Sequence, residues 1–456
     1  MHQEYLCGER ERTMSHFSPE VLTVLMFGGL LIGIFLGHRL AFVLGGLAII
    51  FGYISWGPSI FAIFINRIWG LMDNYVLLAI PLFIFMAQLL NQSGVADDLF
   101  DALRYLLGTL KGGIGITVVI VSTIFAACTG IIGASVVTMG FLALPIMNRY
   151  GYDKKLSYGT ICAGGTLGIL IPPSIMLVIM ASEGALSVGQ LFAGAIIPGF
   201  ILSVLYIGYV LIKCHINPEL GPPLSAEEYA AISKSEIAVK VVKSLLPPML
   251  LVLGVLGSIF FGIATPTEGA AVGAFLTFIL VLAYKKFTWK GFFEAMMKTG
   301  ATTTMVMMVA IGATCFTGVF IAMGGKEVVT GFVLGLGLGK WGTFWVMMFI
   351  VFILGMFIDW LGIVLLCFPV FLPLASQLGF DPIWFVVMIA VNLQASFLTP
   401  PFGYALFYLK GVSPSEISIS DLYRGIVPYI ILMLIGLFIC AAFPQIVLWL
   451  PSIIVG

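Results

Sequence analysis

The sequence has very little charge for its length. Only 9% of its 456 residues are Asp, Glu, Lys or Arg, whereas 61% are hydrophobic. A water-soluble fold of this size needs far more charged residues to cover such an apolar core, so the composition predicts an integral membrane protein. Acids and bases are equal in number, 21 of each, and this balance gives no sign of a nucleic-acid partner.

Residues that enzymes commonly use for catalysis are scarce at membrane depth. The four histidines, His2, His16, His38 and His215, lie in the N-terminal segment or beside the ends of apolar runs. The sequence has no HExxH motif, and its seven cysteines form no CxxC pair. The nucleotide-binding motif GxxxxGK[ST] is also absent, so any transport that the protein performs must draw its energy from an ion gradient or another chain. We therefore expect no enzyme and no covalent cofactor.

Apolar runs of spanning length predict an all-α polytopic membrane protein. A spanning helix needs about 20 apolar residues, and the sequence lacks the alternating pattern of a membrane β-barrel. Residues 1–19 are polar and are expected to form a flexible N-terminal segment. Uninterrupted apolar runs occupy roughly 21–37, 40–60, 75–92, 191–213, 243–262, 267–284, 300–323 and 425–449.

The chain contains two copies of one pattern, 228 residues apart. This offset takes Leu144-Pro145 to Leu372-Pro373 and Pro172-Pro173 to Pro400-Pro401, with no gap between them. Several matches at one spacing predict two homologous repeats, because chance matches would not keep a common offset. We expect the repeats to cover 20–213 and 243–456, joined by a polar cytoplasmic linker at 214–242.

Each repeat has an apolar region that glycine, proline and small polar residues interrupt. Arms of about 15 residues, too short to cross a bilayer comfortably, predict re-entrant helical hairpins at about 113–147 and about 341–376. A broken transmembrane helix follows each hairpin, at about 156–182 and about 383–410. Unpaired backbone is costly in hydrocarbon, so such breaks persist where they line a cavity or bind a ligand. Paired broken helices are typical of the substrate site of a secondary transporter.

Charge predicts that the two repeats have inverted topology. The loop after the first hairpin holds Arg149, Lys154 and Lys155, whereas its counterpart at 376–382 holds no base. Since basic loops face the cytoplasm, the first loop is expected inside and the second outside. Threading the spans from there leaves 16 of the 21 Lys and Arg inside, and both termini outside. The five outer bases are Arg10, Arg12, Arg67, Lys326 and Lys340.

Asp359 lies at the predicted tip of the second hairpin, inside an apolar region. Ionisable residues at that depth are expensive and are usually functional. Beside exposed carbonyl groups, the carboxylate suits a hard cation, with a proton as the alternative ligand; a plain capping role is the structural alternative. The corresponding residue of the first repeat is Ile131, so two ion sites could not be chemically identical. Ser135, at the first tip, is expected to offer its hydroxyl to an ion or substrate, or to cap the second arm.

Small polar residues gather at both broken helices. Any one of them is compatible with ordinary polar contact between helices, but their presence at matching places favours a ligand-lining role. Helix N-termini at the breaks favour an anion, and released carbonyl groups favour Na⁺. The substrate-binding candidates are Ser174, Asn392, Gln394 and Ser396, with Thr166 and Thr399 beside them.

A helix start is predicted at Thr265-Pro266-Thr267-Glu268. Thr followed three residues later by Glu forms a capping box, and proline is favoured at the first helical position. Glu268 is therefore interpreted as a capping residue, with a transport carboxylate as the alternative.

These motifs resemble the large membrane subunit of tripartite ATP-independent periplasmic transporters, over nearly all of 20–450. The resemblance depends on GASVVTMGFLALPIMNRYGYDKKLSYGT, GGTLGILIPPSIMLVIMA, TPTEGAAVGAF and the block from Asp359 to Pro401. It implies an elevator-type fold like that of the ion transporter superfamily, with the hairpins and broken helices moving against a scaffold. It also implies Na⁺-coupled import of small organic acids across the bacterial inner membrane, with both termini periplasmic. The implied partners are a periplasmic substrate-binding protein and a small four-helix membrane subunit.

By position, the resemblance also implies two Na⁺ sites. Members of the family often carry Ser-Gly-Ser-Ser at the first tip, whereas Ile132-Gly133-Ala134-Ser135 keeps only the last serine. Coordination at this tip would therefore depend more on backbone groups. The first site would involve Gly133, Ser135, Gly165, Thr166, Gly168 and Pro172, and the second Asp359, Gly362, Thr399 and Pro400.

Two other functions remain compatible with the sequence. One is a self-sufficient anion symporter or antiporter of the same architecture, coupled to Na⁺ or H⁺. The other is a channel, which saturable uptake driven by a Na⁺ gradient would exclude.

Overall fold

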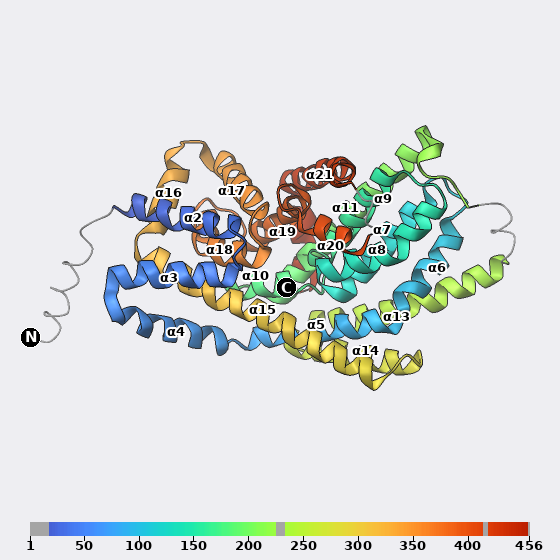
Figure 1. Ribbon diagram of the computed structural model, residues 1–456, viewed down its shortest axis with the longest axis horizontal. Helices are drawn as coiled ribbons and strands as arrows, with labels where there is room; N and C mark the ends of the chain where they lie inside the picture. The colour runs from blue at the N-terminus through green and yellow to red at the C-terminus, as the bar shows by residue number, and fades with distance from the viewer. Residues whose placement is uncertain (1–17, 225–232, 414–417, 455–456) are drawn as a thin grey trace, which may run out of the picture. The chain divides into compact units, whose positions relative to one another are not determined.

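The computed structural model describes residues 18–224, 233–413 and 418–454 (Figure 1). All regular secondary structure in these ranges is helical, and nine of their helices are long and apolar enough to cross a membrane. The prediction of an all-α polytopic membrane protein is confirmed. The predicted N-terminal segment up to residue 17 and residues 225–232 of the predicted linker lie outside the described residues.

The chain folds into two compact units, each built from segments distant in sequence. Unit 1 comprises Met1–Asn74 and Thr304–Asp381, and unit 2 comprises Tyr75–Thr303 and Pro382–Gly456. Each unit therefore draws on both predicted repeats: the second hairpin belongs to unit 1, whereas the second broken helix belongs to unit 2. The repeat boundaries themselves stay a prediction.

Unit 1 packs its helices closely through small residues. A Cβ added to Gly312 would lie 2.5 Å from the Ala41 carbonyl oxygen, so the backbones of α15 and α3 approach closely, as small residues allow within membranes. Phe27 packs edge-to-face against Phe316 and Phe320. The helices are α2 (Pro19–Phe35), α3 (Leu40–Trp56), η1 (Gly57–Ser59), α4 (Ile60–Met72), the later part of α15 (Trp289–Ala322), α16 (Gly325–Gly335), α17 (Gly339–Gly355) and α18 (Trp360–Gln377).

Unit 2 contains the first hairpin and both broken helices. Its first helices are η2 (Tyr75–Leu78), α5 (Ala79–Ser93), α6 (Val95–Leu107), α7 (Gly113–Thr129), α8 (Ile132–Arg149), α9 (Lys154–Thr166), η3 (Leu167–Ile169), α10 (Ile175–Gly184), α11 (Val188–Ile216) and η4 (Pro218–Leu220). They are followed by α13 (Lys234–Phe260), α14 (Pro266–Ala283), α19 (Pro382–Leu398), α20 (Tyr404–Val412), α21 (Ile419–Ala442) and α22 (Gln445–Ile454).

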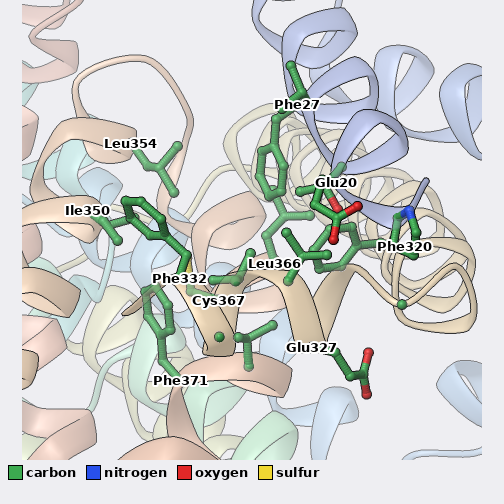
Figure 2. A pocket seen from close by; sticks show the side chains of 18 residues that line it. Glu20, Phe27, Phe320, Glu327, Phe332, Ile350, Leu354, Leu366, Cys367 and Phe371 are labelled. Atoms are coloured by element: carbon green, nitrogen blue, oxygen red, sulfur yellow. The ribbon is translucent and has the colours of Figure 1, made fainter. Parts of the chain in front are cut away.

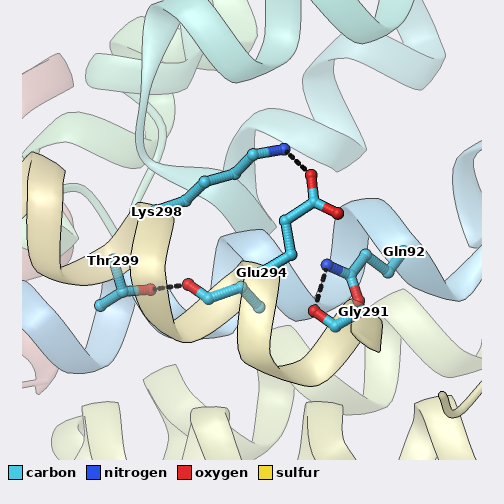
Figure 3. A network of polar contacts seen from close by, with 6 residues as sticks. Gln92, Gly291, Glu294, Lys298 and Thr299 are labelled. Carbon is cyan, nitrogen blue, oxygen red and sulfur yellow. Dashed lines mark hydrogen bonds and ion pairs between the residues drawn. The ribbon is translucent and has the colours of Figure 1, made fainter. Parts of the chain in front are cut away.

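One side-chain hydrogen bond ties the early part of α15 to α5, and two further polar contacts lie within α15 (Figure 3). Gln92 Nε2 donates to the Gly291 carbonyl oxygen at 2.8 Å, while Thr299 donates to the Ala295 carbonyl one turn earlier, at 2.7 Å. An ion pair of 2.7 Å joins Lys298 to Glu294 on the same helix. These bonds occupy polar groups that would otherwise lie unpaired beside apolar spans.

The predicted capping box is confirmed at the start of α14. The backbone N–H of Thr265 donates to Glu268 Oε2 at 2.7 Å, and the N–H of Glu268 donates to Thr265 Oγ1 at 3.3 Å. Pro266 occupies the first helical position. Glu268 thus serves as an exposed capping residue at a helix start.

Helix boundaries recur at the offset that the sequence contains. The helices α8 and α18 are both 18 residues long and begin 228 residues apart, as do the starts of α9 and α19. Gly151 and Gly379 separate these helices with φ angles of 71° and 74°, a region that favours glycine. Matching local structure accompanies the matching sequence, whereas the inverted orientation stays a prediction.

Candidate functional site

The first broken helix is interrupted by five buried residues, from Leu170 to Ser174. Neither Pro172 nor Pro173 can donate a backbone hydrogen bond, and their peptide bond is cis. Helix resumes after Ser174, whose Oγ accepts from the Leu177 N–H at 3.4 Å and donates to the Ile169 carbonyl. The Ser174 hydroxyl, predicted to bind substrate, is therefore used within the break itself.

The tip of the first hairpin lies directly against this break. Gly130 ends α7 in the left-handed conformation, with φ of 62°. A Cβ added there would lie 3.1 Å from the Pro173 carbonyl oxygen and 3.3 Å from the Ile175 nitrogen. Glycine is required on both counts, because the φ angle and the close backbone contact each disfavour a side chain.

Three oxygen atoms of the kind that bind cations lie beside the tip. The hydroxyl oxygens of Thr129 and Ser135 lie 2.9 Å apart. A Cβ on Gly168 would lie 3.1 Å from Ser135 Oγ and 3.4 Å from the Ile131 carbonyl oxygen. Hydroxyl and carbonyl oxygens are hard donors that suit an alkali cation. The predicted Ser135 and Gly168 thus lie together, and the structure adds Thr129 and the carbonyl of Ile131.

Ser135 is not the cap of the second arm. The helix α8 begins at Ile132, its N-cap is Ile131, and Ser135 lies inside the first turn. The small residues at 133 and 134 are helical rather than part of the break. The sequence analysis did not identify Thr129 as a site residue, because its partner Ser135 lies six residues later, beyond the hairpin tip. The position of a hydroxyl group next to the tip glycine, Gly130, could have indicated it.

Two predicted ion-site glycines serve close packing. A Cβ on Gly165 would lie 2.3 Å from Val136 Cγ2, so α9 crosses α8 at short range. A Cβ on Gly133 would lie 3.1 Å from the ring of Tyr408 in α20. The side chain of Thr166 donates to the Ala163 carbonyl oxygen of its own helix at 2.9 Å.

The second broken helix is interrupted between Thr399 and Gly403. The Thr399 hydroxyl donates to the Ala395 carbonyl at 2.7 Å, and the Ser396 hydroxyl donates to the Leu393 carbonyl at 2.9 Å. Such bonds satisfy hydroxyl groups within a helix. The prolyl bond Pro400-Pro401 is cis, as in the first break.

The two broken helices pack on each other and on the first hairpin within unit 2 (Figure 1). The segment α20 contacts α8 and α9, whereas α19 contacts η3 and α10 as well as α9. The sulfur of Cys162 in α9 lies 3.8 Å from the Ala405 carbonyl oxygen in α20. The two breaks therefore belong to one cluster of helices.

Gln394 is the predicted substrate residue with free hydrogen-bonding capacity. Its side chain is fully buried in α19, and within the described chain neither Oε1 nor Nε2 has a partner. Asn392, two residues earlier, is also buried but is engaged in an interaction. Leaving a buried polar group unpaired costs about 1–3 kcal/mol. An amide kept at that cost is suited to a ligand that supplies the missing partners.

Asp359 is the N-cap residue of α18, in unit 1, and is half-buried. Its carboxylate faces the backbone N–H groups of Trp360 and Leu361 at the start of α18, so the capping alternative stays open beside the ion-binding one. A Cβ on Gly362, one turn into α18, would lie 2.9 Å from Leu40 Cδ2 of α3. Thr399 and Pro400 belong to unit 2. Assignment of all four residues to one Na⁺ site stays a prediction.

Known proteins match the chain over most of its length. The family model described as "Tripartite ATP-independent periplasmic transporter, DctM component" matches residues 21–446. The chain is 32% identical over 383 residues to the C4-dicarboxylate TRAP transporter large permease protein DctM of Pseudomonas aeruginosa, covering 83% of this chain and 87% of that protein. It is 30% identical over 390 residues to the sialic acid TRAP transporter large permease protein SiaM of Vibrio cholerae, covering 85% and 88%.

Solved structures agree on the fold. The YdaH transporter of Alcanivorax borkumensis is similar with a TM-score of 0.63, over 93% of this chain and 99% of that chain. The sequence identity is 14%, so this likeness concerns the fold alone.

Proposed function

The chain belongs to the family of tripartite ATP-independent periplasmic transporters as a large DctM-type permease, and we propose that it couples Na⁺ entry to the import of a small organic acid. The observation that carries this proposal is the contact between Gly130 at the hairpin tip and the backbone from Pro173 to Ile175. Irregular backbone persists at membrane depth where it binds an ion or substrate. The hydroxyls of Thr129 and Ser135 beside this contact support an ion site there.

The coupling ion would bind first at the hairpin tip. Ser135, Thr129 and the Ile131 carbonyl would supply oxygen ligands, with backbone groups near Gly168 completing the shell. A second Na⁺ would use Asp359, because an ionised carboxylate in an apolar region is costly unless a cation neutralises it.

The organic acid would bind near the starts of α10 and α20. Each helix begins at a break, where N–H groups without intrahelical partners and the helix dipole favour an anion. The break segments 170–174 and 399–403 contain no charged side chain, so recognition would depend on these dipoles and on neutral donors. Gln394 Nε2 is such a donor. Two relatives named for C4-dicarboxylate and sialic acid transport support an acid as the substrate class.

An inverted repeat is compatible with the helix contacts of unit 2. The first half of one broken helix, α9, packs on the second half of the other, α20, as well as on its first half, α19, while α10 contacts α19. Segments that run in opposite directions pair their opposite halves in this way. In this proposal, hairpins and broken helices move against a scaffold in the bacterial inner membrane, with both termini in the periplasm.

The family description "tripartite" supports two partners. We propose a small four-helix membrane subunit, which would hold the scaffold, and a periplasmic binding protein, which would deliver the acid.

The test is reconstitution of the full chain with both partners in vesicles. We expect saturable uptake of a labelled acid, from a panel including C4-dicarboxylates and sialic acid, that needs an inward Na⁺ gradient. Equal uptake without the binding protein would instead support a self-sufficient symporter or antiporter. Non-saturable conductance without coupling to Na⁺ would indicate a channel and refute the proposal.

A further inference from the structure

A cavity of about 1030 Å³ lies inside unit 1, between α2 and the helices α16, α17 and α18 (Figure 2). Its volume lies just above the range of about 300–1,000 Å³ for small-molecule sites. The residues that α2 contributes include Glu20, Thr23, Val24 and Phe27. These positions share one helical face, so the cavity is bounded by a continuous stripe of α2.

The interior walls are aromatic and aliphatic. Phe27, Phe332 and Phe371 project into the same space from α2, α16 and α18, and Leu354 of α17 lies nearby (Figure 2). An apolar cavity left open would forfeit dispersion contacts along its lining. In a protein with spans of bilayer length, hydrocarbon chains are the apolar material at hand to fill it.

The mouth of the cavity is acidic. Glu20 and Glu327 both line the cavity, and Gly324 lies close to Pro19 and Glu327, because a Cβ there would lie 3.4 Å from Pro19 Cβ and 4.0 Å from Glu327 Oε2. Glu20 follows Pro19 directly, and both acids are exposed. Among the described residues no Lys or Arg side chain lines the cavity, and Lys326, next to Glu327, is not part of its wall. The charge favours an ammonium group and disfavours an anionic headgroup.

One polar group inside the cavity lacks a partner. Thr23 is 9% exposed, lines the cavity one turn below Glu20, and its Oγ1 has no hydrogen-bond partner within the described chain. A buried hydroxyl without a partner costs free energy. From its position one turn below Glu20, the Thr23 hydroxyl can donate a hydrogen bond to a polar group that lies just beneath a charged headgroup.

We propose that this cavity holds an amine-bearing phospholipid, phosphatidylethanolamine. Its ammonium group pairs with Glu20 and Glu327, an ester carbonyl of its glycerol region accepts from Thr23, and its acyl chains lie against the phenylalanine walls. This lipid occupies the space between α2 and the second hairpin, and it does not depend on the transported substrate.

Native mass spectrometry of the full chain tests the proposal, after extraction from nanodiscs with equal amounts of phosphatidylethanolamine and phosphatidylglycerol. We expect phosphatidylethanolamine to be retained at least about fivefold over phosphatidylglycerol. The double variant Glu20→Gln, Glu327→Gln removes this preference, and Thr23→Val lowers retention. The matched control Glu294→Gln changes an exposed acid of α15 away from the cavity and keeps the preference.

A second variant tests whether the acyl chains lie in the cavity. Gly331→Trp places a large ring at a lining position of α16 where an added Cβ meets nothing within 4 Å, so retained phosphatidylethanolamine should fall at least about fivefold while the melting temperature is kept. Equal retention of both lipids by the parent chain, or retention that Gly331→Trp leaves unchanged, overturns the proposal. The proposal is also overturned if the cavity holds no lipid because a helix of a partner protein fills it.

Discussion

At the scale of single residues, a few buried hydroxyl and amide groups provide the chemistry of the broken segments. Thr129 and Ser135 bond to each other across the hairpin tip, whereas Gln394 has no partner in the described chain. We propose the first pair as ion ligands, whereas the amide of Gln394 has unused hydrogen-bonding capacity. Removal of the Ser135 hydroxyl should therefore weaken ion binding, whereas removal of the Gln394 amide should raise stability.

Ser135→Ala should weaken Na⁺ dependence without removing the fold. Loss of one oxygen donor to a cation should cost about 1.5–3 kcal/mol, as for hydrogen bonds to charged groups, or about tenfold and more in binding. The measurement is the Na⁺ concentration for half-maximal uptake. Ser244→Ala, which removes a hydroxyl bonded within α13, is the control; an unshifted Na⁺ dependence in Ser135→Ala would reject the assigned ligand.

Gln394→Met should stabilise the protein while reducing uptake of the acid. The substitution keeps the volume but removes two unpaired polar atoms, whose burial costs about 1–3 kcal/mol. Thermal unfolding and uptake are measured on the same preparation. Gln92→Met is the matched control, because that amide is bonded to the Gly291 carbonyl (Figure 3) and its loss should lower stability. A destabilised Gln394→Met with normal uptake would show that the amide is structural.

Sequence reasoning at this scale succeeds where partners are close in the chain. The bond between Thr265 and Glu268 spans three residues and was predicted. The prediction that Ser135 caps the second arm was wrong, because Gly133 and Ala134 are compatible both with a break in the chain and with the first turn of a helix. The unpaired state of Gln394 depends on every side chain around it, and no local pattern encodes it.

At the scale of elements, helix pairs in unit 2 are positioned by glycines that leave no room for a side chain. Gly165 brings α9 onto α8, and Gly159 lies against the Gly425 carbonyl oxygen of α21. Proline and glycine in the sequence predicted where helices stop. They did not predict which neighbour each glycine faces, because that depends on packing between distant segments.

Gly165→Ala should destabilise the α8–α9 crossing. The new Cβ would lie 2.3 Å from Val136 Cγ2 and 3.0 Å from its Cα, and such overpacking costs about 1–3 kcal/mol. Gly208→Ala in α11 is the control, since nothing lies within 4 Å of its added Cβ and alanine favours helix by up to about 1 kcal/mol. Both are compared by thermal unfolding; equal melting temperatures would contradict the crossing.

Asp97→Asn should stabilise α6 near neutral pH. Partial desolvation, together with repulsion from Asp98 and Asp101, raises the pKa of the Asp97 carboxyl above its ordinary value, while a hydrogen bond from the backbone N–H of Asp97 and the charge of Lys286 oppose the shift. A raised folded-state pKa means that the fold favours the protonated form, so stability falls as pH rises through that pKa.

The difference between Asp97→Asn and the parent should therefore vanish in acid and appear as pH rises, in thermal unfolding between pH 4 and 8. Asp101→Asn is the control, because it removes an ion pair of 3.3 Å with Arg104 and should bring no gain. A pH-independent difference for Asp97→Asn would rule out titration as its cause.

At the scale of the whole molecule, composition and the 228-residue repeat predicted the class of protein but not its compact units. The helices α2, α3 and α4 share unit 1 with a hairpin that lies about 300 residues later. All of these segments are similarly apolar, so hydropathy gives no preference for one partner over another. The cavity beside α2 was likewise invisible in the sequence.

Cysteine labelling tests whether the repeats are inverted. Lys154→Cys and Ser376→Cys place thiols at exposed positions at the start of α9 and near the end of α18, which border the loops that follow the first and second hairpins. The six cysteines of the described chain are buried, and Cys7 is replaced by serine as background. A membrane-impermeant maleimide should label position 376 from the outside and position 154 from the cytoplasmic side. Labelling of both from one side would refute inversion.

The contact at Gly130 has a consequence for how tightly ion and cargo are linked. In this structure the hairpin tip covers the N-terminus of α10, and the covering residue, Gly130, has no side chain whose rotation could open a path. An acid that is to reach those N–H groups must lift the whole tip, and lifting the tip separates Thr129 and Ser135 from the segment that follows α9. In the proposed mechanism, neither the ion nor the acid would be exchanged without displacing groups that bind the other, so uncoupled leakage of the ion would be prevented.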